Sequence, residues 1–76
     1  MKRGTYVEHR HTKQLGVVGH HTPGVESFAY IYWLTAWDNA TERSHFYVEY
    51  TDLNSVTLLI IDIPLSLQTL KRQVCG

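Results

Sequence analysis

Cysteine is nearly absent from this sequence of 76 residues, in which Cys75 is the only one and lies beside Gly76. A single cysteine cannot form a disulfide within the chain, and one small core contributes only about 3–5 kcal/mol of stability. The fold must therefore rest on regular packing without a covalent staple. The lack of disulfides is typical of a reducing compartment, so we expect a cytoplasmic protein in which Cys75 is a free thiol.

Long hydrophobic runs are also missing. The longest run of aliphatic residues, Leu58–Ile61, is far shorter than the roughly 20 residues that a membrane-spanning helix needs. The N-terminal segment does not predict a signal peptide, because residues 4–13 are polar and include Glu8, His9 and Arg10. We therefore expect a soluble chain without a membrane partner.

The chain has no net charge, since seven Lys and Arg residues balance seven Asp and Glu residues. Both ends are basic, whereas residues 15–70 contain six carboxylates and one basic residue, Arg43. Nucleic-acid binders normally carry excess basic groups, because neutralising phosphates supplies much of their affinity. Weak nucleic-acid binding through the basic ends and the stackable rings of Tyr6, Tyr30 and Tyr32 is therefore a secondary interpretation.

The residues that dominate are β-branched and aromatic, which favour strands. The pattern predicts five strands, at about residues 5–10, 14–19, 28–37, 45–51 and 56–63. Turn signals separate them, among them Pro23-Gly24, Asp38-Asn39 and a single turn of 3₁₀ type at 52–54. Short strands at this spacing predict an all-β meander or barrel that forms one domain over residues 1–76.

A short helix is predicted near the C-terminus, over about residues 67–75. Ser66 can cap its start, and Leu67, Leu70 and Val74 form an apolar stripe. A helix of two to three turns is marginal in water by itself. It must therefore pack on the strands or on another molecule.

Three short segments carry a resemblance to a known fold family. They are Gly4-Thr5-Tyr6-Val7, Leu15-Gly16-Val17-Val18 and Tyr50-Thr51-Asp52-Leu53. Together, over residues 3–55, they resemble the opening glycine and strand, the Gly-x-Val strand and the closing turn of KOW-type SH3-like barrels. The intervening glycine of that family is absent at 12–14. The resemblance implies a five-stranded SH3-like barrel and contact with RNA, ribosomes or RNA polymerase.

No catalytic motif is present: no serine lies in a nucleophile elbow, and residues 16–19 lack the Lys-Ser/Thr of a phosphate loop. The segment Ser44-His45-Phe46-Tyr47 is similar in position to the Val-Gln-Ile-Tyr motif of plasmid-encoded type II dihydrofolate reductases, which are SH3-like barrels of similar length. Only Tyr47 matches, and the substrate-binding glutamine of that family is missing. We therefore predict no enzyme and no cofactor. Among enzyme functions, the alternative is an oligomeric enzyme whose active site lies between subunits.

Five histidines are a high share for this length. His9 and His11 share one face of a predicted strand, and if His20 or His21 lay across from them, three imidazoles would converge on a zinc ion. His9, His11 and His20 are weak metal candidates, because the fixed Cys and His spacings of strong zinc sites are absent. We interpret the histidines as exposed residues that make the surface charge sensitive to pH, and we predict no metal site.

The predicted strand at 28–37 is the most informative feature, because both of its faces are apolar. Alternation places Trp33 and Trp37 on one face and Tyr30 and Tyr32 on the other. A half-buried strand would be polar on one face. Either the strand is central and covered on both sides, for example by the C-terminal helix, or one face contacts a partner, since Trp and Tyr dominate interface energetics.

The sequence therefore predicts a non-enzymatic binding module that regulates a larger protein complex by occupying its surface. The size and the KOW-like outline suit a phage-encoded regulator or inhibitor of host transcription machinery, with RNA polymerase as the first partner to test. The expected partner-binding residues are Trp33, Trp37, Tyr32, Tyr47, Arg10 and Lys13.

Overall fold

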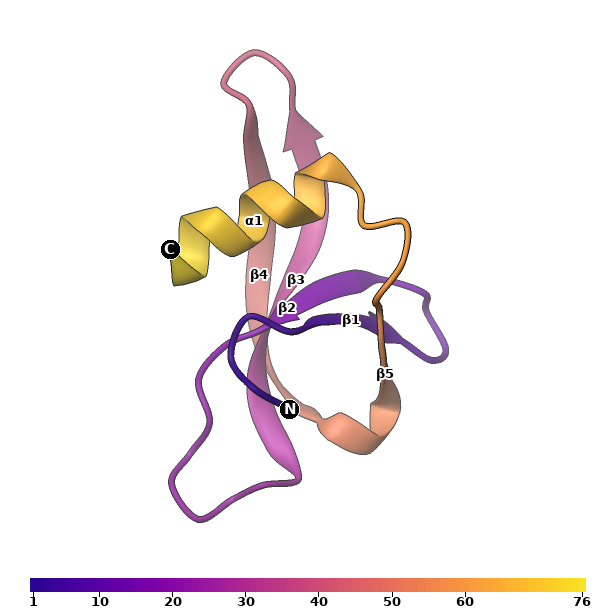
Figure 1. The fold of residues 1–76 in the computed structure, drawn as a ribbon, viewed down its shortest axis with the longest axis vertical. Helices are drawn as coiled ribbons and strands as arrows, with labels where there is room; N and C mark the ends of the chain where they lie inside the picture. Colours follow the sequence, from indigo (N-terminus) through magenta and orange to yellow (C-terminus); the bar gives the residue numbers. More distant parts are fainter.

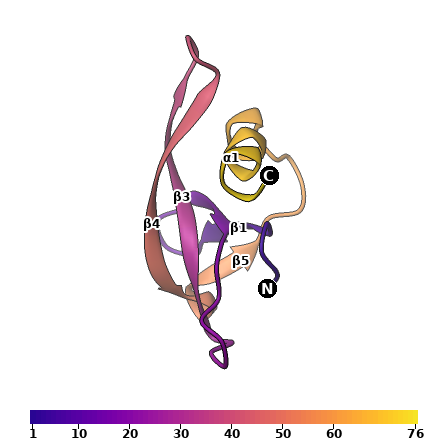
Figure 2. The same ribbon diagram turned by 90° about the vertical axis from the view of Figure 1, so that its left-hand side faces the viewer.

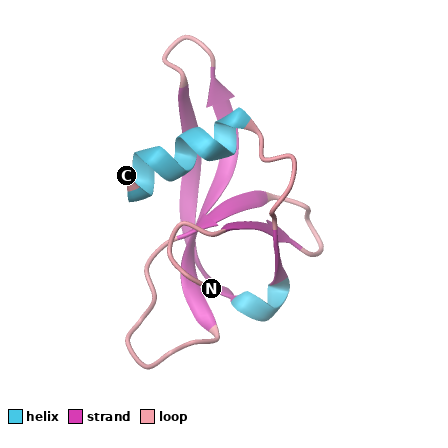
Figure 3. Ribbon diagram, in the orientation of Figure 1, coloured by secondary structure: helices cyan, strands magenta, loops and turns pink.

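The computed structural model describes residues 1–76 and confirms a mainly-β fold with one short C-terminal helix. The strands are β1 (Tyr6–His9), β2 (Leu15–Val18), β3 (Phe28–Asp38), β4 (Arg43–Asp52) and β5 (Val56–Leu58). The 3₁₀ turn η1 (Leu53–Ser55) precedes β5, and the helix α1 (Leu65–Cys75) ends the fold (Figure 1, Figure 3). All strand pairs are antiparallel in the order β4-β3-β2-β1-β5, so β4 and β5 are the two edges.

The first hydrophobic core lies on one face of this sheet. In Figure 1, β1 and β2 run at a steep angle to β3 and β4, so the sheet curves around that face. Alternate residues of the strands point into the curve, as a period of two requires. The buried members are Val7, Val18, Ala29, Ile31, Trp33 and Val56, and Leu53 of η1 packs against them.

A second core lies on the opposite face, beneath α1. Figure 2 shows the helix on one side of the ribbon formed by β3 and β4. Leu67 and Leu70 are fully buried against Val17, and the half-buried Tyr32 and Leu34 pack beside them. Burying each leucine contributes about 1.5–3 kcal/mol, which stabilises a helix that is marginal in water by itself. The predicted apolar stripe of the helix is confirmed.

The start of the helix differs from the prediction. α1 begins at Leu65, its N-cap is Pro64, and no side chain caps it. Ser66 therefore lies in the first turn, where its carbonyl oxygen accepts a hydrogen bond from the Ser44 hydroxyl. The prediction that Ser66 caps the helix is wrong, because the helix already begins at Leu65 and Ser66 is its second residue. No helix has the length and apolar character needed to cross a membrane.

Two strands differ from their predicted bounds by more than one residue at an end. β5 ends at Leu58 instead of residue 63, because the chain leaves the sheet after the Leu59 N–H donates to the Tyr6 carbonyl. Asp62 then adopts a left-handed backbone (φ 55°) that turns the chain toward Pro64. β4 begins two residues earlier than predicted, at Arg43, so β3 and β4 form a long hairpin that gives the molecule its greatest dimension of 40 Å.

A β-bulge in β3 changes which way one tryptophan faces. Trp33 pairs with Tyr47, but the register shifts between Leu34 and Ala36, and Trp37 pairs with Ser44. The extra residue interrupts the alternation of side chains. Trp37 therefore lies on the α1 side of the sheet, and the prediction that it shares a face with Trp33 is wrong.

Candidate interaction surface

Five side chains form an apolar surface on β3 and β4 that no other element covers. They come from alternate positions of the two strands, and they are Phe28, Tyr30, Phe46, Val48 and Tyr50, which we call the aromatic face. Tyr30 lies opposite Tyr50 in the register, so period-two alternation brings all five to the α1 side of the sheet. Four of them are 39 to 47 % exposed, and Phe28 is partly buried.

The rings of this surface pack against one another. Phe28 stacks on Tyr50 with ring centroids 5.4 Å apart, and Tyr30 lies 4.8 Å from the same ring. Tyr32 makes an edge-on contact with Phe46 at 5.6 Å. These spacings lie within the favourable range for aromatic pairs. Because neighbouring rings restrict their rotamers, the aromatic face loses little further conformational freedom on binding.

The position of α1 explains why these rings remain exposed. Ser66 and Gln73, near the two ends of the helix, both contact Ser44, so α1 crosses the sheet at the end near the β3–β4 turn. Tyr32 lies at the edge of the area that α1 covers. It packs beside the buried leucines of the helix, and its ring lies directly over Gly19, the residue after β2. The helix has eleven residues and does not reach Tyr30 or Tyr50.

A second group of exposed apolar residues lies around the connection from β5 to α1. Leu58, Ile60, Ile61 and Leu65 are all well exposed, Ile60 the most at 84 %. Unlike the aromatic face, most of this segment lies outside regular secondary structure. Its side chains therefore do not share the face of one regular element.

Trp33, which we expected to bind a partner, belongs to the core. It is 1 % exposed, its indole N–H donates to the Thr51 hydroxyl at 3.4 Å, and its ring makes an edge-to-face contact with His9, with ring centroids 5.8 Å apart. The prediction of a contact residue is wrong here, because both neighbours of β3 and the curve of the sheet bury this side of the strand. Trp37 is partly buried, and its indole N–H donates to the Asn39 side chain at 3.0 Å.

The other expected contact residues lie in three different places. Tyr47 is 45 % exposed on the sheet face opposite the aromatic face, and its hydroxyl donates to Gln14 at 3.0 Å. Arg10 and Lys13 are exposed in the turn between β1 and β2, where Lys13 has a left-handed backbone (φ 66°). Tyr32 lies on the α1 side. The structure therefore does not gather the six predicted residues into one patch.

The histidines have structural contacts. The ring nitrogen Nδ1 of His9 accepts from the backbone N–H groups of His11 and Thr12, at 3.2 and 3.3 Å, and so fixes the β1–β2 turn. His20 is exposed, and the structure brings no three His, Cys, Asp or Glu side chains together in a way that could hold a metal ion.

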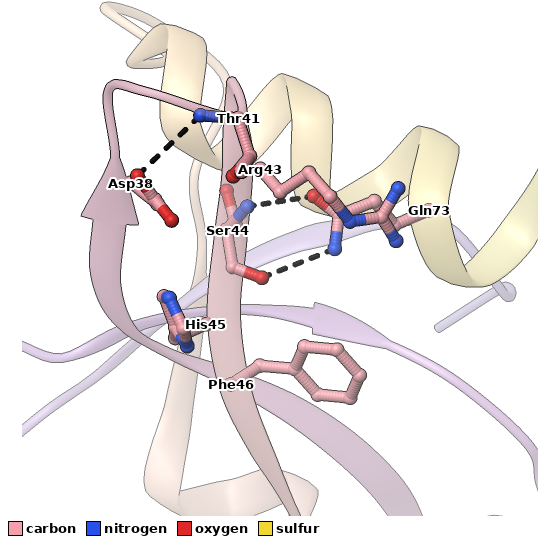
Figure 4. Close-up of a pocket in the computed structure, with 7 residues that line it drawn as sticks. All are labelled: Asp38, Thr41, Arg43, Ser44, His45, Phe46 and Gln73. Atoms are coloured by element: carbon pink, nitrogen blue, oxygen red, sulfur yellow. Dashed lines mark hydrogen bonds between the residues drawn. The ribbon is translucent and has the colours of Figure 1, made fainter.

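A shallow polar pocket lies beside the β3–β4 turn (Figure 4). Asp38 accepts backbone hydrogen bonds from Ala40 at 3.0 Å and Thr41 at 3.4 Å. Hydrogen bonds from the Thr41 side chain and the Ala40 backbone lower the pKa of this carboxyl. Ser44 is in the same pocket, but its hydroxyl donates to Ser66 and its backbone is held by Gln73. A serine engaged in this way is not poised as a nucleophile.

The two basic ends of the chain meet on α1. Arg3 donates to the Val74 carbonyl at 3.1 Å, and the Lys71 ammonium lies 5.1 Å from the centre of the Tyr6 ring. This arrangement neutralises carbonyl groups at the C-terminal end of the helix. It also concentrates positive charge around one end of α1.

Sequence reasoning missed most of the aromatic face. Tyr30 was expected to stack on nucleic acid, whereas Phe28, Phe46, Val48 and Tyr50 had no expected role. The alternation of Phe46, Val48 and Tyr50 in the predicted strand was the available signal. Pairing that strand as a hairpin with residues 28–37 would have placed these residues beside Tyr30.

Comparison of the chain with known proteins finds no matching family, no matching curated protein and no matching solved structure. The resemblance to KOW-type SH3-like barrels therefore stays a prediction. The site must be interpreted from its own geometry.

Proposed function

We propose that this chain is a non-enzymatic binding module that holds a larger protein through the aromatic face. The observation that carries the proposal is the exposed, mutually packed set of rings on β3 and β4, with Tyr50 between Phe28 and Tyr30. Aromatic side chains are enriched in protein interfaces because they bury large areas at low entropic cost. The partner has a complementary apolar surface.

The resemblance of residues 3–55 to KOW-type barrels makes transcription machinery the first partner class to test. In this proposal the chain is a phage-encoded regulator that occupies a surface of host RNA polymerase and thereby inhibits or redirects it. The neutral net charge supports a protein partner over a nucleic acid, because steering toward phosphate requires excess positive charge.

The test is a binding measurement between the chain and purified bacterial RNA polymerase, at low and high salt and with nuclease treatment. The variants are Tyr30→Ser and Tyr50→Ser, which remove rings of the aromatic face. Tyr47→Ser is the matched control, because Tyr47 is equally exposed on the opposite face of the sheet. We expect salt-resistant binding that both face variants lose and the control retains.

Equal loss with Tyr47→Ser would place the contact on the other face. Absence of binding to the polymerase, together with a different captured protein whose binding depends on Tyr30 and Tyr50, would retain the aromatic face and reject the named partner. Insensitivity of every captured protein to Tyr30→Ser and Tyr50→Ser would overturn the proposal.

One observation favours a second candidate, a weak nucleic-acid-binding function. Lys71 lies over the Tyr6 ring and Arg3 contacts Val74 of the same helix, so this end of α1 combines positive charge with a ring on which a base can stack. This alternative predicts affinity for single-stranded nucleic acid that falls steeply as salt rises. It also predicts that Lys71→Gln weakens binding more than Tyr50→Ser does.

A further inference from the structure

The outer edge of β4 is an open line of backbone hydrogen-bonding groups. β4 has ten residues and lies at the end of the sheet, beside β3 alone. The strand contains no proline and no lysine, and its register irregularity falls in β3. Proline, lysine and a bulge are among the devices that protect an edge strand from pairing with another chain, and β4 has none of the three; its charged residues are Arg43, Glu49 and Asp52.

The hydrogen bonds of β3 identify which residues of β4 point outward. Tyr30 bonds through its N–H and C=O to residues 19 and 20, on the β2 side, so its neighbours Ala29 and Ile31 point toward β4. They pair with Thr51 and Glu49. In an antiparallel ladder the direction alternates with every residue, so the backbone groups of Phe46, Val48 and Tyr50 point away from the sheet.

One end of this edge is already occupied. The Ser44 N–H donates to the Gln73 side-chain oxygen at 2.7 Å, and the Gln73 side-chain nitrogen donates to the Ser44 carbonyl at 3.1 Å (Figure 4). The amide thus takes the place of a neighbouring strand at Ser44. The open stretch of the edge therefore runs from Phe46 to Tyr50.

We propose that a second copy of this chain binds at this edge, with the two β4 strands antiparallel and Val48 facing Val48 across a two-fold axis. In this register Phe46 lies opposite Tyr50 of the other copy at both ends of the open stretch. Each of these three residue pairs exchanges two backbone hydrogen bonds. The two five-stranded sheets become one continuous sheet, and the two aromatic faces join into a single surface.

The charges and the blocked end select this register over its neighbours. A two-fold axis perpendicular to the sheet makes one residue of the strand face itself. Centring the pair on Tyr47 would place Tyr50 opposite Ser44, whose backbone groups are held by Gln73. Centring it on Glu49 would place two carboxylates directly opposite each other, which is unfavourable. Of these three registers, only the one centred on Val48 avoids both.

Two further properties of the chain suit self-association. Its net charge is zero, so two copies do not repel each other at long range. The exposed side chains on the α1 side of the edge are Phe46, Val48 and Tyr50, and aromatic and β-branched residues form favourable cross-strand pairs. This pairing does not depend on the proposed protein partner, and either can hold without the other.

The test begins with sedimentation velocity on the whole chain from about 5 µM to about 1 mM, where mass action must shift a monomer toward a dimer. We expect a dimer at the upper end. Val48→Lys and Val48→Asp should each weaken the dimer by about tenfold or more, because like charges would face each other at the axis. An equimolar mixture of the two variants should form a heterodimer.

Leu58→Lys is the matched control. Leu58 is an exposed apolar residue on β5, the other edge of the sheet, so the same substitution there should leave the dimer intact. A chain that remains monomeric throughout the concentration range would overturn the proposal. So would a dimer that Leu58→Lys abolishes, or one that survives both Val48 variants.

A measurement on the unmodified chain covers the case in which the variants fail to fold. Backbone N–H groups of Phe46, Val48 and Tyr50 should exchange slowly with solvent at high concentration and quickly on dilution, whereas those of Glu49 and Thr51 should be protected in both. In a mixture of labelled and unlabelled chains, a contact between the α-protons of Tyr47 and Glu49 of different copies would establish the register. Rapid exchange at Val48 in a concentrated sample would reject the β4 edge as the contact.

Discussion

Gln73 and Ser44 are joined by two hydrogen bonds that reproduce a strand pairing with a single side chain. The Ser44 backbone donates to the Gln73 amide oxygen at 2.7 Å and accepts from its nitrogen at 3.1 Å. The Ser44 hydroxyl adds a third link to α1 by donating to the Ser66 carbonyl. This contact fixes the helix to the edge of the sheet and satisfies backbone groups that would otherwise be half-buried without partners.

Replacing Gln73 tests this link. We expect Gln73→Ala to lower the free energy of unfolding by about 1–3 kcal/mol, because two partly buried hydrogen bonds are lost. Gln73→Glu keeps the acceptor but loses the donor, so its effect should be at least half as large. Urea denaturation followed by circular dichroism measures both. Gln68→Ala is the control: it removes an exposed hydrogen bond of the same helix to Ile63 and should cost less.

Trp33 and Trp37 should respond very differently to truncation. Trp33→Ala removes the largest buried side chain and should cost about 3–5 kcal/mol, which leaves a domain of this size largely unfolded. Trp37→Ala removes a partly buried ring at the far end of the hairpin and should cost clearly less. Thermal unfolding of both variants measures the difference in destabilisation. Equal destabilisation would contradict the assignment of Trp33 alone to the core.

Gly19 is required by the ring of Tyr32. A Cβ atom at Gly19 would collide with the Tyr32 ring and come within 3.0 Å of the Tyr30 carbonyl oxygen. We expect Gly19→Ala to lower the free energy of unfolding by about 1–3 kcal/mol through overpacking. Combining it with Tyr32→Leu should recover part of that loss, because a smaller side chain leaves room for the methyl group. If the double variant lost the full sum of the two single effects, the proposed collision would not be the cause.

The pH dependence of Asp38 follows from the turn that it closes. Its pKa lies below the ordinary value of 3.8 because the Thr41 side chain and the Ala40 backbone donate hydrogen bonds to the carboxylate. The ionised Asp38 carboxylate therefore stabilises the folded state. This stabilisation is fully present above the pKa of Asp38 in the unfolded chain, and it is lost as the pH falls through the lower pKa of Asp38 in the folded chain. An NMR titration of the Asp38 carboxyl should give a midpoint below 3.8, and the Ala40 amide should shift with it. A midpoint at or above that value would show that the turn does not hold the carboxylate.

Much of the fold was predictable from local patterns. Alternating apolar residues identify β4, and the spacing of Leu67, Leu70 and Val74 identifies the helix and the side that it buries. The two apolar faces of β3 indicated a central strand. The sequence alone left open whether its second face was covered or exposed. The structure shows both, because α1 covers Tyr32 and Leu34 and stops before Tyr30.

The sequence by itself determined the number and type of the elements, because the periods of two and 3.6 depend only on neighbouring residues. The tertiary structure decided which residues are available to a partner. The bulge beyond Leu34 moved Trp37 to the α1 side, and the neighbours of β3 buried Trp33. The crossing point of α1 at Ser44 left Tyr30 and Tyr50 exposed. These outcomes depend on register and on contacts between distant segments, and no local pattern carries that information.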